Sequence, residues 1–166
     1  MLTILVKLFK ALNSEQSPNQ LAIAISLAAI LGLTPFLSLH NILILFIALI
    51  FRVNLTLLIL SYPLFALLGY LLSPWFQQVG SSLLQAPSLT DFWTAFFNTL
   101  IGRWSDFYYS GVMGSFVIAI LTAIILYPLS RLMIVAYRHK WLDKINQIHL
   151  VKLLKTSRFW QLYSQG

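Results

Sequence analysis

The residues best suited to chemistry lie in a short polar segment that interrupts a long apolar stretch. The stretch from Gln16 to Phe51 contains no Lys, Arg, Asp or Glu, and its polar interruption holds Thr34, Pro35, Ser38, His40 and Asn41. A histidine inside an apolar segment is a typical site for proton transfer or ligand binding. The alternative is structural: His40 and Asn41 cap the next helix and satisfy backbone groups freed by Pro35. We favour the structural interpretation, because no carboxylate close in sequence pairs with His40 for acid–base catalysis.

The other reactive side chains form no catalytic or metal-binding pattern. The chain has no cysteine, which excludes disulfides, thiolate nucleophiles and sulfur metal sites. His139 and His149 lie in a basic tail without a carboxylate cluster, so they do not predict a metal site. Arg103 and Asp106 have the spacing of a weak surface ion pair. We therefore expect no catalytic residue, no cofactor and no metal ion, and we do not expect an enzyme.

Composition points to a membrane protein. Hydrophobic residues make up 59% of the 166 residues and charged residues only 9%, against about 25% charged in soluble domains. A charge at the centre of a bilayer costs about 2.5–3.5 kcal/mol, which accounts for the long charge-free stretch. The net charge of +7 comes from basic residues beside apolar segments, where they suit anionic lipid rather than nucleic acid. We predict an all-α polytopic membrane protein with one membrane domain over residues 1–166.

A Pro-broken hairpin is expected over residues 18–51. Ser17 to Gln20 has the pattern of a capping box with proline at the first helical position, and Pro35 ends the first arm. Each arm has about 15 residues and so about 22 Å of helix, whereas a complete crossing needs about 20 residues. This shortfall favours a re-entrant hairpin with His40 near its tip, although two complete spans remain an alternative.

The next segments are a span over 53–72 and a polar linker over 77–87. Arg52 and Asn54 lie at the start of the span and are interpreted as a cytoplasmic anchor. Ser73, Pro74 and Trp75 are expected to close it.

An amphipathic interfacial helix is expected over 88–109. Ser88 and Asp91 have the spacing of a capping box, and the apolar face carries Trp93, Phe97 and Trp104. Such a helix lies in the plane of the membrane interface or docks on the spans.

A second span is expected over 111–133, followed by a basic amphipathic tail over 138–163 that binds anionic headgroups. Gly111 and Gly114 allow close helix contact. Of the 11 Lys and Arg residues only Arg103 lies in the loop 73–110, so the other side, with both termini, is expected to be cytoplasmic. We also expect no cleavable signal peptide.

Residues 18–75 resemble a family of bacterial inner-membrane proteins, domain of unknown function 2062. The resemblance rests on the Gly-x-x-Pro turn from Gly32 to Pro35, then Leu39-His40-Asn41, and then the Arg-x-Asn pattern of Arg52 and Asn54. Ser38 stands where the family often has glycine. The resemblance implies a bacterial inner-membrane location and no known activity. It also implies a partner, since some small relatives are encoded beside a large envelope protein.

Two functions of different classes follow. The first is a non-enzymatic inner-membrane subunit that anchors or assists a larger membrane or periplasmic protein in lipid handling or transport. The second is a small transporter or channel subunit built on the re-entrant hairpin. A short chain cannot bury re-entrant backbone by itself, so both functions predict a partner or a homo-oligomer. A membrane enzyme acting on lipid is a third alternative.

Overall fold

The computed structural model describes residues 16–138, and in this part of the chain all regular structure is helical, without a strand. The prediction of an all-α fold is confirmed. The elements are α2 (Pro18–Leu33), α3 (Leu39–Ile50), α4 (Leu55–Leu71), α5 (Ser73–Leu84), the short 3-10 helix η1 (Pro87–Leu89), α6 (Thr90–Phe97), α7 (Leu100–Trp104) and α8 (Ser110–Ala136). All but one residue of the tail predicted over 138–163 lies outside the described residues.

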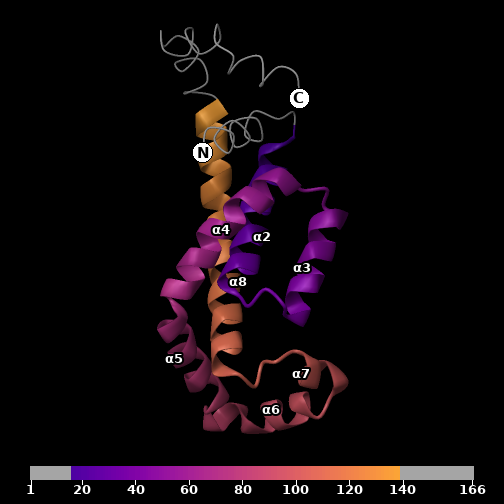
Figure 1. Cartoon of the computed structure of the whole chain (residues 1–166), viewed down its shortest axis with the longest axis vertical. Coiled ribbons are helices and arrows are strands. Elements are labelled where there is room, and N and C mark those ends of the chain that lie inside the picture. Colours follow the sequence, from indigo (N-terminus) through magenta and orange to yellow (C-terminus); the bar gives the residue numbers. More distant parts are fainter. Residues whose placement is uncertain (1–15, 139–166) are drawn as a thin grey trace, which may run out of the picture.

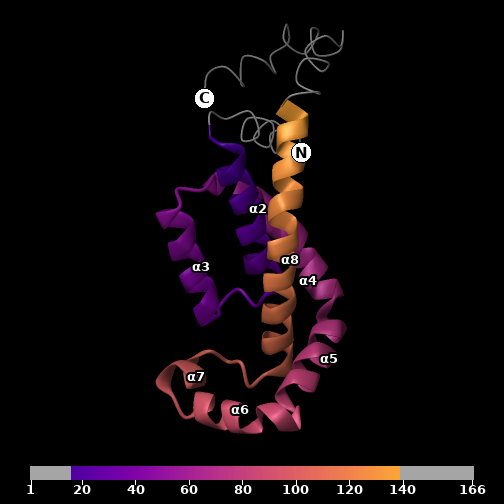
Figure 2. The ribbon, with the colours of Figure 1, turned by 180° about the vertical axis from the view of Figure 1, so that it is seen from behind.

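The long helix α8 is the axis of the fold (Figure 1). Helix α2 packs along α8, α5 packs beside the first half of α8, and α4 packs on α2. Arg131 Nε donates to Asn19 Oδ1 at 2.7 Å, and Arg138 Nη2 donates to the carbonyl of Gln16 at 3.0 Å. These bonds hold the start of α2 beside the end of α8. Helices α6 and α7 cross the opposite end of the molecule (Figure 2).

Local sequence rules explain both ends of α2. The Ser17 side chain accepts a hydrogen bond from the Gln20 backbone N–H, and the Gln20 side chain accepts one from the Ser17 N–H. The predicted capping box is therefore confirmed. The helix ends at Leu33, because Pro35 pushes Thr34 into extended geometry at φ −103° and ψ 159°.

Arg52 and Asn54 form the junction between α3 and α4. Arg52 has a left-handed backbone with φ 48°. Its N–H donates to the carbonyl of Leu49 at 3.1 Å, and the next N–H, of Val53, donates to Ala48 at 3.2 Å. This pair of bonds is the Schellman motif, whose left-handed position is usually glycine. Asn54 then caps α4 by accepting from the N–H of Leu57 at 2.8 Å. The structure thus assigns both residues a role in the backbone turn.

The prediction of a polar linker over 77–87 is wrong for most of its length. Helix α5 begins at Ser73, directly after α4, at a bend of 69°. Pro74 lies in the first turn of α5, where a backbone N–H would have no hydrogen-bond partner within the helix, so the proline costs no helical bond. The helix is held by a backbone contact with α8: a Cβ added at Gly80 would lie 1.8 Å from the carbonyl oxygen of Ser110, and one added at Gly114 equally close to that of Phe76. The close helix contact predicted at Gly114 is confirmed.

The single helix predicted over 88–109 is also wrong. The chain forms η1, α6 and α7 instead, and Ser88 makes no capping bond to α6. The chain turns at Thr99, which starts α7 by accepting from the N–H of Gly102 at 3.0 Å. Gly102 lies against α6 so closely that an added Cβ would be 2.0 Å from the Phe96 carbonyl oxygen.

One described helix, α8, is by itself long and apolar enough to cross a membrane. Helices α4 and α5 meet the same criterion only as a bent pair, and α2 and α3 are apolar but shorter. Length and composition therefore support one candidate span, or two if the bent pair counts as one. The polytopic arrangement stays a prediction.

Candidate functional site

The turn between α2 and α3 satisfies its own backbone through Asn41. Asn41 is buried, and its Nδ2 donates to the carbonyls of Pro35 at 2.8 Å and Phe36 at 3.3 Å. Thr34 Oγ1 donates to the Ile30 carbonyl at 2.7 Å and lies 3.0 Å from Asn41 Oδ1. The Ser38 hydroxyl also donates to Pro35. Asn41 therefore satisfies backbone groups of the turn, as the structural interpretation predicted, but it does not cap the second arm, because α3 has no side-chain cap.

His40 does not share that role, so the expectation that it caps the second arm is wrong. Its side chain is 9% exposed, and neither Nδ1 nor Nε2 has a hydrogen-bond partner among the described residues. The ring lies against two aromatic rings, with centroid distances of 5.8 Å to Phe107 and 5.0 Å to Phe116. The hairpin tip is thereby packed on the segment that leads into α8.

The aromatic contacts continue from His40 into α6. Phe107 lies 6.3 Å from Phe96 by ring centroids, and Trp93 stacks on Phe97 at 5.8 Å. Trp93 Nε1 donates to the Leu83 carbonyl at 3.0 Å, which ties α6 to α5. Trp104 is 70% exposed. The three residues assigned to one interfacial face are therefore split between a packed pair and an exposed side chain.

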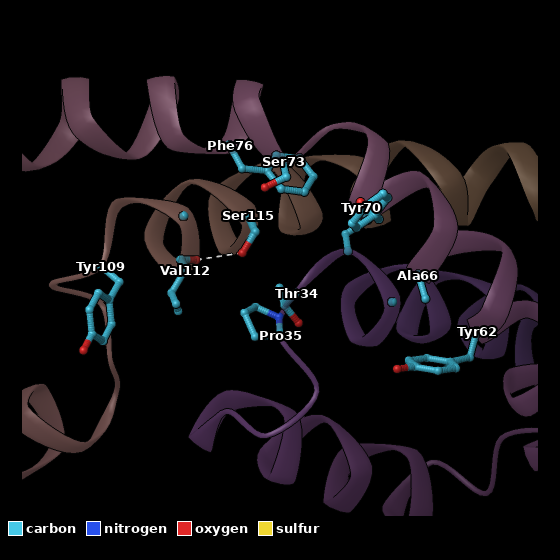
Figure 3. A pocket seen from close by; sticks show the side chains of 14 residues that line it. Thr34, Pro35, Tyr62, Ala66, Tyr70, Ser73, Phe76, Tyr109, Val112 and Ser115 are labelled. Carbon is cyan, nitrogen blue, oxygen red and sulfur yellow. Dashed lines mark hydrogen bonds between the residues drawn. The ribbon is translucent and has the colours of Figure 1, made fainter.

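A pocket of about 420 Å³ lies beside the hairpin turn (Figure 3). Its walls come from three segments: residues 32–35 at the end of α2, residues 62–76 around the bend between α4 and α5, and residues 109–115 at the start of α8. Of the five candidate residues at the hairpin tip, Thr34 and Pro35 line the pocket, whereas Ser38, His40 and Asn41 do not. Tyr62, Tyr70, Ser73 and Tyr109 line the pocket and were not predicted.

The chemistry of the pocket is that of apolar groups and hydroxyls. No lining residue is charged. The Ser115 hydroxyl donates to the Val112 carbonyl at 2.9 Å (Figure 3). The Thr34 hydroxyl donates in the same way to the Ile30 carbonyl. Next to the pocket, hydrogen bonding to Tyr109, with smaller effects of burial and of Asp106, raises the pKa of Tyr108 to about 12. Within residues 16–138 no group of three His, Cys, Asp or Glu side chains gathers to hold a metal ion.

Comparisons with known proteins place the chain in a family. Residues 4–142 match the family DUF2062, described as an uncharacterised protein conserved in bacteria. An uncharacterised protein of Treponema pallidum (strain Nichols) is 29% identical over 157 residues, which cover 95% of this chain and 97% of that relative. No solved structure matches the chain. The candidate site combines the turn between α2 and α3 with an uncharged pocket beside it, and the chain belongs to the DUF2062 family.

Proposed function

We propose that the protein is a multi-pass bacterial inner-membrane subunit without catalytic activity of its own. In this proposal both termini are cytoplasmic, and the protein anchors or assists a larger envelope protein in lipid handling. The steps of the proposal are membrane insertion, a re-entrant hairpin, and a partner that covers the hairpin turn.

Exposed apolar side chains support insertion. The outward faces of α3 and α8 form what we call the apolar belt, whose side chains are 56–65% exposed: Ile42, Leu43, Phe46, Leu49, Leu121, Ile124, Ile125 and Leu132. Soluble proteins rarely expose a contiguous apolar surface larger than a few hundred Å². A bilayer or a partner protein must cover the belt.

Helix lengths support a re-entrant hairpin. The 16 residues of α2 rise about 24 Å and the 27 residues of α8 about 40 Å, against a hydrocarbon core of about 30 Å. The start of α2 is hydrogen-bonded to the end of α8, so the hairpin enters the membrane from the side where α8 ends. Its tip contacts Phe116, six residues after the start of α8 and about 9 Å along the helix, and also Phe107 in the segment just before α8.

The distribution of charge supports the orientation. Arg131 and Arg138 lie at the end of the molecule where α2 begins. The opposite end, with α6 and α7, carries Asp91, Arg103 and Asp106. Excess positive charge marks the cytoplasmic side of a membrane protein.

The exposed hairpin turn is the observation that carries the subunit role. Phe36 is 61% exposed and Leu37 is 92% exposed, in a non-helical segment. Non-helical backbone at membrane depth is tolerated only where protein or a water-filled cavity covers it. A partner protein on this turn meets that requirement. Two of the hydroxyls that line the pocket nearby, those of Thr34 and Ser115, are already bonded to helix carbonyls. No acid–base pair lines it, which favours a subunit over an enzyme.

Two measurements test this proposal. Alkaline phosphatase fused after Gln85 should be active and fused after Gly166 inactive, and the reverse pattern would contradict the topology. Purification of the full chain in mild detergent should retain a larger protein in fixed stoichiometry. Leu37→Ser should release that protein, whereas Ile124→Ser, on the apolar belt, should keep it. Retention in both variants would contradict a partner at the turn.

The open pocket favours one alternative, a small transporter or channel subunit. Its polar Thr34, Ser73 and Tyr109 lie beside the hairpin turn, as expected for a pathway built on broken helices. A purified homo-oligomer that conducts ions or transports solute would support this alternative over the first.

A further inference from the structure

We propose that the pocket of about 420 Å³ beside the hairpin turn binds one acyl chain of a membrane phospholipid. The inference rests on the membrane insertion proposed above, but not on the existence of a larger partner. Small-molecule sites typically measure about 300–1,000 Å³. A volume near the lower end suits a segment of one chain and not a whole phospholipid.

The lining excludes a charged ligand group. All of the lining residues are uncharged, so no side chain there is placed to fix a phosphate or a carboxylate. Leu33, Ala66, Phe76 and Val112 supply apolar wall on all three segments. The part of the ligand that enters the pocket is therefore apolar.

The buried hydroxyls of the pocket do not offer free donors either. Thr34 is 5% exposed and Ser115 is 2% exposed, and both hydroxyls donate to carbonyls of their own helices. The exposed polar groups are tyrosines instead: Tyr70 is 80% exposed and Tyr109 is 58% exposed. Tyrosine hydroxyls suit the ester region of a bilayer, where an apolar ring meets polar headgroups.

The surroundings identify the bilayer as the source of the chain. The pocket is bordered by residues on two exposed apolar segments, the hairpin turn with Leu37, 92% exposed, and the end of α4 with Leu71, 62% exposed. In the inserted protein the end of α4 faces lipid, whereas the partner proposed above covers the hairpin turn. An acyl chain of a neighbouring phospholipid can enter from the hydrocarbon layer while its headgroup stays at the interface.

Photocrosslinking tests the proposal on the full-length chain. The protein is placed in phosphatidylethanolamine and phosphatidylglycerol vesicles that contain a trace of phospholipid with a diazirine on its acyl chain. Adducts mapped by mass spectrometry should be enriched on peptides of the pocket, such as the one with Val112, relative to the peptide with Ile124 on the apolar belt. Ala66→Phe should lower the pocket adducts roughly ten-fold, because a close-packed wall leaves no room for the chain.

Control variants separate pocket filling from misfolding. Leu67→Phe places the same aromatic side chain at the neighbouring position, which is 58% exposed, and should leave the pocket adducts unchanged. Gly111→Val adds volume from α8, where an added Cβ would meet only Gln77 Cγ at 3.8 Å, and should lower the adducts as Ala66→Phe does. This second filling variant keeps the test decisive if Ala66→Phe fails to fold.

Two results would overturn the proposal. Pocket adducts that neither filling variant lowers would mean that lipid touches only the outer surface. A cysteine introduced by Ala66→Cys, in a chain without native cysteine, should react slowly with a water-soluble maleimide; reaction as fast as that of Gln85→Cys would mean a water-filled pocket. Loss of adducts at Ile124 as well would reject membrane insertion itself. Pocket adducts without any co-purified protein would reject only the subunit role.

Discussion

Replacing His40 by phenylalanine should stabilise the protein. The ring is 9% exposed, lies 5.8 Å from Phe107 and 5.0 Å from Phe116 by centroids, and has no hydrogen-bond partner at either nitrogen within the described residues. A buried polar group without a partner costs about 1–3 kcal/mol. Phenylalanine keeps the planar ring and removes both nitrogens. After a small packing penalty for the larger ring, we expect the free energy of unfolding to rise by about 1–2 kcal/mol.

The adjacent residue provides a control of opposite sign. Asn41 is as buried as His40, but its side chain bonds to the carbonyls of Pro35 and Phe36. Asn41→Ala leaves those carbonyls without their partner and should lower the free energy of unfolding by about 1–3 kcal/mol. The contrast between His40→Phe and Asn41→Ala separates removal of an unbonded polar group from removal of hydrogen bonds.

The assay is equilibrium unfolding of the full-length protein in mixed micelles, followed by helical circular dichroism. The reasoning would be refuted if His40→Phe lowered the free energy of unfolding while His40→Gln kept its native value. That result would mean that water or a ligand bonds to the ring nitrogens. That outcome would support the functional interpretation of His40, under which His40→Gln keeps the fold but impairs activity by removing titration near neutral pH.

Three further predictions concern other parts of the fold, and the same unfolding assay measures the changes in stability that they name. Arg52, at φ 48°, should tolerate glycine within about 1 kcal/mol, whereas Arg52→Val should destabilise by roughly 1–2 kcal/mol, because a β-branched side chain resists left-handed geometry; equal effects would contradict the Schellman assignment. Gly114→Ala should separate α5 from α8 and strongly destabilise the protein. Gly111→Ala has room for the added methyl group and should stabilise the protein by up to about 1 kcal/mol through helix propensity. An unchanged stability of Gly114→Ala would disprove the backbone contact between α5 and α8. Trp93→Ser should lower the free energy of unfolding by removing the hydrogen bond to the Leu83 carbonyl. Trp104→Ser, at an exposed position, should leave the free energy of unfolding unchanged and weaken vesicle or partner association. Destabilisation by Trp104→Ser and not by Trp93→Ser would mean that Trp104 packs in the core.

Short-range rules were enough to predict where several helices begin and end. Ser17 with Gln20 determines the start of α2, and Pro35 determines its end, because both effects act within four residues. Arg52 was harder: its left-handed turn is normally signalled by glycine, so a basic residue there suggested a membrane anchor instead. The anchor role stays a prediction beside the structural one.

The predictions that proved wrong concern segments whose structure depends on contacts between distant residues. A polar composition over 77–87 suggests a linker, but Gly80 meets α8 backbone to backbone, and that contact makes a packed helix of α5. Periodic apolar residues over 88–109 suggest one helix, but α7 turns back against α6, where Gly102 lies close to the Phe96 carbonyl. His40 was a candidate from its type and place, yet nothing in its local sequence indicates Phe107 or Phe116 as neighbours.

The pocket follows from two interruptions of helix that lie at the same level. One is the turn at Thr34 and Pro35, and the other is the 69° bend between Leu71 and Ser73. Each is predictable as a break from its proline, but their proximity depends on contacts between distant residues. Gly32 of α2 lies against Gly69 of α4, and α8 packs against both α2 and α5. Broken backbone inside a membrane must face protein or a cavity. Two breaks side by side cannot fill one another with regular side-chain packing, so a hollow remains where they meet α8. Any function of this fold that needs a site within the membrane is therefore expected at this hollow and not along the regular helix faces.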